Sequence, residues 1–212
     1  MKPIILIMIK NFFSYVFELI KVVAISLAII IPIRYYLIQP FYVKGASMEP
    51  NFYDKEYLII DEISYRFHVP ERGDIVVFRY PRNQQEYFIK RVIGLPGEKV
   101  QLKDGFVYIY NQEQSDGFKL EEKYLSPDLR TYGLNEEIMA LGDDEFYVLG
   151  DNRNSSKDSR SFGVVARKYI TGRVLLRGWP LNRVNVFSAP EYSYWWFNLQ
   201  LAISNYELIV NW

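Results

Sequence analysis

The run Tyr87-Phe88-Ile89-Lys90-Arg91-Val92-Ile93 does most to decide the fold of this 212-residue chain. Its aromatic and β-branched residues predict a strand, in which alternate side chains point to opposite faces. Lys90 then lies between Phe88 and Val92 on one face. A lysine among apolar neighbours on a core strand breaks the expected pattern, and such breaks mark candidate functional positions. An edge-strand lysine that prevents aggregation is the alternative interpretation.

Similar short runs occur on both sides of this strand. Turn signals such as Arg72-Gly73-Asp74, Leu95-Pro96-Gly97 and Lys103-Asp104-Gly105 bound them. The runs that we expect to form strands are residues 41–43, 56–60, 74–78, 106–110, 145–149 and 170–176. Residues 111–143 are polar and irregular, which indicates a small insertion. The sequence therefore predicts a mostly β domain over residues 39–190.

The first 38 residues have a different character. An uncharged core, VVAISLAIIIPI, lies between Lys21 and Arg34, and apolar flanks extend it over roughly residues 15–37. A helix of that length can cross a bilayer about 30 Å thick. We expect residues 1–38 to form one membrane anchor that ends or kinks near Pro32. A buried core helix and a cleaved export signal remain alternatives.

The C-terminal residues 191–212 are rich in aromatic side chains, with amides scattered among them. This composition fits a segment that lies in the membrane interface. A second membrane span and an ordinary packing helix are the alternatives.

The composition excludes several kinds of catalytic site. The chain has no cysteine and one histidine, His68, so a thiol nucleophile, a zinc site built on sulfur and a multi-histidine metal cluster are all ruled out. With 25 basic and 25 acidic residues it lacks the positive excess of nucleic-acid binders. We expect no metal, no other cofactor and no nucleic-acid partner.

A serine nucleophile needs a base, and a lysine can serve if burial lowers its pKa. The candidate serine is Ser47, in the run KGASMEP at residues 44–50. Gly45 and Ala46 leave the backbone open, so that a backbone N–H beside Ser47 could stabilise an oxyanion. An ordinary turn serine is the alternative.

A second polar segment, residues 149–163, could support such a base. It reads LGDNRNSSKDSRSFG, and its serine and asparagine groups could orient a neighbouring amine. Asp158 and Arg160 could pair to hold the loop. A solvated loop between strands is the alternative.

Four motifs follow the apolar anchor in the sequence. They are Ser47-Met48-Glu49-Pro50, Arg72-Gly73-Asp74-Ile75-Val76-Val77-Phe78, Lys90-Arg91-Val92-Ile93-Gly94-Leu95-Pro96-Gly97, and Gly150-Asp151-Asn152-Arg153 with Asp158-Ser159-Arg160. Together they resemble the motifs of the type I signal peptidases, which are membrane-anchored serine proteases of the S26 family with a Ser/Lys dyad. The resemblance covers roughly residues 15–184.

The resemblance implies an antiparallel β-sheet domain of the type shared by signal peptidases and the self-cleaving SOS repressors. It makes Ser47 the nucleophile and Lys90 its general base. It also implies that Ser156 orients the Lys90 amine, that Asp158 and Arg160 form a supporting ion pair, and that the backbone N–H of Ser47 is one oxyanion donor. The positions that match the family's shallow substrate pockets are Phe41, Val43, Met48 and Ile89.

One departure from the family concerns the oxyanion site. Some members carry a serine at the position of Gly45, and its hydroxyl is a second oxyanion donor. The glycine here puts that donor in doubt.

The function implied is removal of N-terminal signal peptides from exported preproteins. The partners would be those signal peptides and the lipid bilayer. We expect a monomer in the cell membrane, with one span and the catalytic domain on the extracytoplasmic side. The alternatives are a dedicated maturation protease of the same fold and an inactive membrane-anchored β module.

Overall fold

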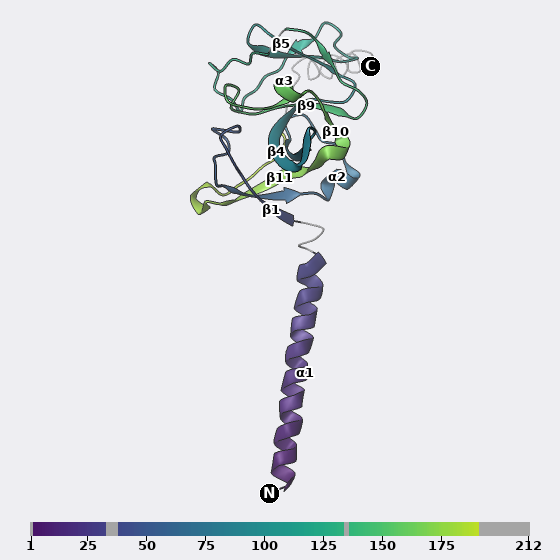
Figure 1. Cartoon of the computed structure of the whole chain (residues 1–212), viewed down its shortest axis with the longest axis vertical. Coiled ribbons are helices and arrows are strands. Elements are labelled where there is room, and N and C mark those ends of the chain that lie inside the picture. Colours follow the sequence, from purple (N-terminus) through teal and green to yellow (C-terminus); the bar gives the residue numbers. More distant parts are fainter. Residues whose placement is uncertain (1, 33–37, 134–135, 191–212) are drawn as a thin grey trace, which may run out of the picture.

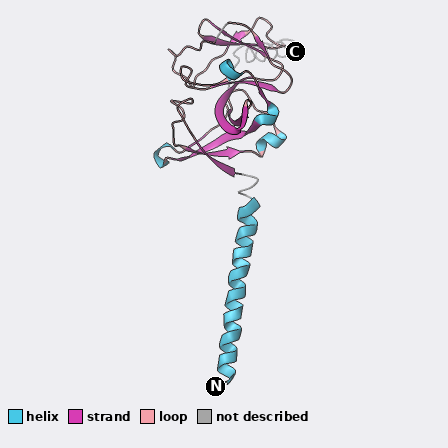
Figure 2. Ribbon diagram, viewed as in Figure 1, coloured by secondary structure: helices cyan, strands magenta, loops and turns pink. Residues whose placement is uncertain are grey.

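The computed structural model describes residues 2–32, 38–133 and 136–190. One long helix, α1 (Lys2–Pro32), stands clear of a β domain, and strand β1 lies at the end of that domain nearest the helix (Figure 1). Figure 2 shows the strands gathered in this one domain. The structure confirms the expected order of an apolar helix followed by a mostly β domain.

Helix α1 contains a stretch, Asn11–Ile31, that is long and apolar enough to cross a membrane, with a mean hydropathy of 2.2. The rest of the described chain buries none of this stretch. The helix starts at Lys2, earlier than the expected start near residue 15. Pro3 does not prevent this, because the first turn of a helix needs no N–H from it. The expected end of the anchor at residues 33–37 lies outside the described residues, as does the expected interfacial tail at residues 191–212.

The larger sheet has eight strands in the described residues, and its neighbouring strands pair antiparallel. Its order is β1-β2-β11-β3-β4-β9-β10, with β12 beside β11. The strands are β1 (Ile38–Tyr42), β2 (Tyr57–Asp61), β3 (Ile75–Tyr80), β4 (Asn83–Gly94), β9 (Glu145–Leu149), β10 (Val165–Ala166), β11 (Ile170–Trp179) and β12 (Asn185–Val186). Every strand expected from the sequence overlaps one of these or β6 of the smaller sheet.

The smaller sheet has the order β7-β6-β5-β8 in the described chain. Its strands are β5 (Lys99–Lys103), β6 (Phe106–Tyr110), β7 (Phe118–Lys119) and β8 (Met139–Ala140). Strands β7 and β8 belong to the expected insertion at residues 111–143. That segment is therefore not wholly irregular, because its two short strands extend both edges of the β5–β6 hairpin.

Two short helices, α2 (Ser64–Phe67) and α3 (Ser159–Phe162), complete the fold with 3₁₀ turns at Arg167–Tyr169 and Leu181–Arg183. Helix α3 begins directly after Asp158, whose carboxylate accepts a hydrogen bond from the backbone N–H of Arg160. An acidic side chain is a preferred N-cap because it satisfies a free N–H of the first turn.

Strand β3 is buried on both of its faces, and strand β4 pairs alongside it. Val76 and Phe78 belong to one apolar cluster, together with Val92 of β4. Ile75 and Val77 belong to another. Because β4 pairs along β3, with Val76 opposite Lys90, the lysine lies beside a fully buried residue of the sheet.

Candidate active site

The structure brings Ser47 and Lys90 together although 43 positions separate them in the sequence. Lys90 Nζ and Ser47 Oγ are hydrogen-bonded at 2.7 Å, and Lys90 Nζ also donates to the carbonyl oxygen of Ile89 at 2.7 Å. Lys90 is 3% exposed. Its strand supplies the rigidity that a fixed base requires, since a site built on a strand is more precise than one on a loop.

Burial of the Lys90 amine lowers its pKa from 10.5 to about 8. Apolar surroundings disfavour the ammonium form of a lysine. The charges of Asp158 and Asp151 act in the opposite direction and keep the pKa from falling further. The amine can therefore lose its proton at a pH well below that of a solvated lysine.

Ser47 lies in a turn that follows β1, and Asn152 holds the backbone of that turn. The backbone N–H of Asn152 donates to the carbonyl of Ser47 at 3.1 Å, and its side-chain amide donates to the carbonyl of Ala46 at 3.0 Å. Gly45 has a φ of +89°, a conformation that favours glycine, and its N–H donates to Asp54. The N–H of Ser47 has no hydrogen-bond partner in the described chain.

Asp158 and Arg160 form the ion pair that the sequence predicted. Two hydrogen bonds of 2.8 Å join the guanidinium to the carboxylate, which also accepts the N–H of Gly150 at 3.0 Å. Burial alone would raise the pKa of Asp158, but Arg160, Gly150 and the Ser156 hydroxyl together hold that pKa below its usual range. The carboxylate is therefore ionised across the neutral range.

Ser156 lies close to Ser47, but the structure does not place the Ser156 hydroxyl on the Lys90 amine. Ser156 Oγ is buried and has no hydrogen bond of standard geometry in the described residues, although its hydroxyl helps to lower the pKa of Asp158. Gly150 separates it from Ser47: a Cβ on Gly150 would lie 2.5 Å from Ser156 Cβ and would also overlap the Ser47 carbonyl. The absence of a side chain at residue 150 allows the two loops to approach.

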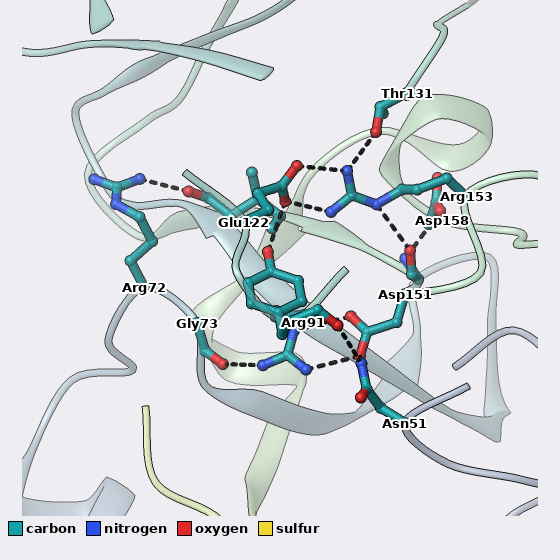
Figure 3. A network of polar contacts seen from close by, with 12 residues as sticks. Asn51, Arg72, Gly73, Arg91, Glu122, Thr131, Asp151, Arg153 and Asp158 are labelled. Carbon is teal, nitrogen blue, oxygen red and sulfur yellow. Dashed lines mark hydrogen bonds and ion pairs between the residues drawn. The ribbon is translucent and has the colours of Figure 1, made fainter. Parts of the chain in front are cut away.

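A network of polar contacts joins Asn51, Arg91, Asp151 and Arg153 to their partners, and sequence reasoning missed most of it (Figure 3). The Arg91 guanidinium donates to both oxygens of Asp151, at 2.8 and 2.7 Å. Asp151 also accepts the side-chain amide of Asn51 at 2.8 Å. These bonds tie the strand that carries Lys90 to the turn that carries Ser47. An arginine inside an apolar strand was the signal that a buried acidic partner exists.

The same network reaches the insertion at residues 111–143. Arg153 forms an ion pair with Glu122 and a hydrogen bond to Thr131, while its Nε donates to the carbonyl of Gly150 at 3.0 Å (Figure 3). The insertion therefore braces the loop that approaches Ser47.

A pocket of about 550 Å³ opens beside Ser47 and Lys90. Of the four residues expected to line substrate pockets, Phe41, Val43 and Ile89 belong to the lining of this pocket. Met48 is not on the pocket wall. Its side chain is 1% exposed and packs in the core with Val43, because the turn after Ser47 directs it inward.

The described residues contain no group of three or more His, Cys, Asp or Glu side chains that could hold a metal ion. His68 lies away from the pocket lining, is exposed, and its Nδ1 contacts the carbonyl oxygen of Ser64 at 3.2 Å.

Residues 16–179 match the family described as signal peptidase, peptidase S26. A signal peptidase I of Leptolyngbya laminosa is 42% identical over 185 residues, which cover 84% of this chain and 86% of that protein. A probable signal peptidase I-2 of Synechocystis sp. is 39% identical over 177 residues, which cover 81% of this chain and 77% of that protein. A solved signal peptidase I from Enterococcus faecalis V583 is 33% identical, covers 50% of this chain and 97% of that one, and has a TM-score of 0.41.

These matches make the chain a peptidase. More narrowly, it belongs to the signal peptidase family, peptidase S26.

Proposed function

We propose that this chain is a type I signal peptidase, which removes N-terminal signal peptides from exported preproteins with Ser47 as nucleophile and Lys90 as general base. The observation that carries the proposal is the 2.7 Å separation of Lys90 Nζ and Ser47 Oγ, with the lysine buried. A general base must lie within hydrogen-bond reach of the proton that it takes. The names of the relatives do not favour the alternatives of a dedicated maturation protease or an inactive module.

The reaction is an acyl transfer in two steps. The neutral Lys90 amine takes the proton of Ser47 as the serine oxygen attacks the scissile carbonyl. The resulting ammonium returns that proton to the leaving amine, and water then hydrolyses the acyl-enzyme with the same lysine as base. A pKa of about 8 suits both roles, because the two forms of the amine are then accessible near neutral pH.

The oxyanion of the tetrahedral intermediate would bind the backbone N–H of Ser47, which is free to donate. Gly45 offers no side-chain hydroxyl, and its own N–H is engaged by Asp54. Asp158 and Arg160 support the loop around Gly150. Ser156 would orient the amine if its hydroxyl turns toward Lys90 when substrate binds.

The substrate would bind as an added strand, in which main-chain hydrogen bonds give affinity and pockets give specificity. Phe41, Val43 and Ile89 would contact the small side chains one and three residues before the cut, and Met48 would form the core behind them. Export signals carry this small-x-small pattern at their cleavage sites.

The apolar helix α1 would anchor the chain by one span, with the β domain on the extracytoplasmic side. Lys2, Lys10 and Lys21 precede or begin the most apolar part of the helix, which favours a cytoplasmic amino terminus. A shared membrane raises the effective concentration of enzyme and substrate. We propose that the chain acts as a monomer.

The experiment is to incubate the purified full chain, in lipid vesicles, with a preprotein and to identify the new N-terminus by mass spectrometry. We expect one cut after a small-x-small sequence. Ser47→Ala and Lys90→Ala should each abolish it. Ser155→Ala and Lys103→Ala are matched controls at exposed positions and should cleave at the rate of the unaltered chain.

Cleavage by Lys90→Ala at the unaltered rate would refute the assignment of the base. Circular dichroism of each variant separates loss of chemistry from loss of fold. A panel of unrelated preproteins then separates a general signal peptidase from a protease dedicated to one substrate.

A further inference from the structure

Lys157 places a positive charge on the wall of the pocket that contains Ser47 and Lys90. Its Nζ lies 4.4 Å from the ring centroid of Tyr80 and 5.8 Å from that of Phe88. The two rings are stacked, with centroids 4.6 Å apart and planes at 10°. Contacts of an ammonium with aromatic faces are attractive and hold the cation in place.

This ammonium has no anionic partner in the described part of the chain: no carboxylate oxygen lies within 4.0 Å of Lys157 Nζ. Its backbone is fixed, because the next residue, Asp158, is buried and paired with Arg160 and with the N–H of Gly150. The side chain therefore presents a cation without an anionic partner to the pocket, from a backbone position that its neighbour holds in place.

The strand β4 offers an open edge next to this cation. Its first half pairs with β3, but β9 pairs with β4 only at Arg91–Gly94. A peptide strand added along residues 85–89 would alternate its side chains between the two faces of the sheet.

The two faces differ in chemistry. Ile89 lies on the face whose apolar cluster includes Phe41 and Val43. Phe88 lies on the opposite face, with the Tyr80 ring and Lys157. A substrate whose first and third residues before the cut contact Phe41 and Ile89 would turn its second residue toward Lys157.

We propose that Lys157 is a specificity-determining residue that recognises an acidic side chain at the second substrate residue before the cut. This inference rests on the proposed function, since it takes the substrate strand and its cleavage point from there. Three other lysine or glutamate residues of the described chain line the pocket. Lys90 is the proposed base, Glu86 accepts a hydrogen bond from Asn83, and Lys44 follows Val43 in the chain.

The test uses three synthetic signal-peptide substrates that differ only at the second residue before the cut, which is Glu, Gln or Lys. Their dissociation constants are measured on the Ser47→Ala chain, so that binding is read without cleavage. We expect the Glu peptide to bind about three- to fivefold more tightly than the Gln peptide, the range of an exposed ion pair, and the Lys peptide to bind more weakly. Adding Lys157→Gln should abolish the differences, and adding Lys157→Glu should reverse them.

Lys168→Gln, combined with Ser47→Ala, is the matched control, because Lys168 also contacts an aromatic ring, that of Tyr169, but does not line the pocket. It should retain the preference for the Glu peptide. Equal binding of all three peptides to the Ser47→Ala chain, or a preference that survives Lys157→Gln, would overturn the inference. Cleavage of the Gln peptide by the unaltered chain is measured in parallel. Charge-selective binding without cleavage would count against the proposed function alone.

Discussion

Replacing Lys90 by methionine should make the protein more stable at neutral pH while abolishing its activity. The amine has a pKa of about 8 in the folded chain and of 10.5 when solvated, and a tenfold change in its affinity for the proton corresponds to about 1.4 kcal/mol. Below pH 8 the folded state must therefore bear a buried ammonium at a cost of about 3 kcal/mol. Methionine is similar in length, is apolar and adapts to irregular cavities.

The sign of the pH dependence follows from proton binding. Between about pH 8 and 10.5 the unfolded Lys90 binds more protons than the folded one, so the free energy of unfolding of the unaltered chain rises with pH through that range. The methionine variant lacks this contribution. Loss of the hydrogen bonds to Ser47 and Ile89 subtracts about 1 kcal/mol each at every pH. The variant should thus be more stable by about 1 kcal/mol at about pH 6.5 and less stable by about 2 kcal/mol at about pH 10.5.

The assay is equilibrium unfolding of both chains in detergent by guanidinium chloride at several pH values, followed by tryptophan fluorescence. Lys103→Met, at an exposed lysine, is the control and should show a difference that does not change with pH. If the difference in free energy of unfolding between Lys90→Met and the unaltered chain is also constant across this pH range, the reasoning is refuted. Such a result would mean that Lys90 titrates as a solvated amine.

Three further predictions concern the surroundings of the pair. Gly150→Ala should lower kcat by at least about tenfold, because the new Cβ would overlap both Ser156 and the Ser47 carbonyl. The measurement is cleavage of a fluorogenic signal peptide, and an unchanged kcat would show that the loops carrying Ser47 and Ser156 can separate without loss of activity. Asp158→Asn should lower the free energy of unfolding by about 3 kcal/mol, as loss of one partner of a buried ion pair does. That loss should be present above pH 3.8 and vanish as the pH falls through the lower pKa of the folded Asp158, a trend that acid unfolding curves of both chains would reveal. His68→Gln should leave kcat/KM unaltered in the same peptide assay, since His68 does not line the pocket; a large loss would implicate the histidine instead.

Local patterns in the sequence were sufficient to predict the strands that carry the pair. Strand β4 was predictable because aromatic and β-branched residues surround Lys90, and β6 because a run of such residues directly follows the turn signal Lys103-Asp104-Gly105. Strand β5 was missed, since KVQLK alternates but is mostly polar. The two-residue strands β7 and β8 carry no pattern of their own and form only by pairing with β6 and β5.

The pairing of side chains across the fold was harder to predict. The resemblance assigned Ser47 and Lys90, and their approach depends on contacts between residues far apart in the chain. Arg91 and Asp151 are 60 positions apart, and Arg153 and Glu122 are 31 apart. A local pattern shows that a buried charge needs a partner, but only the folded chain shows which partner it finds.

The pH dependence of kcat/KM tests most directly whether a buried neutral lysine activates Ser47. It is measured on the full chain in vesicles with a neutral signal peptide, because kcat/KM reports the ionisations of the free enzyme. We predict an acidic limb with an apparent pKa of about 8, the value that burial gives Lys90, in both the unaltered chain and His68→Gln. An acidic limb with an apparent pKa of about 6.5 that disappears in His68→Gln would contradict the account, and so would a limb with an apparent pKa of about 10.4.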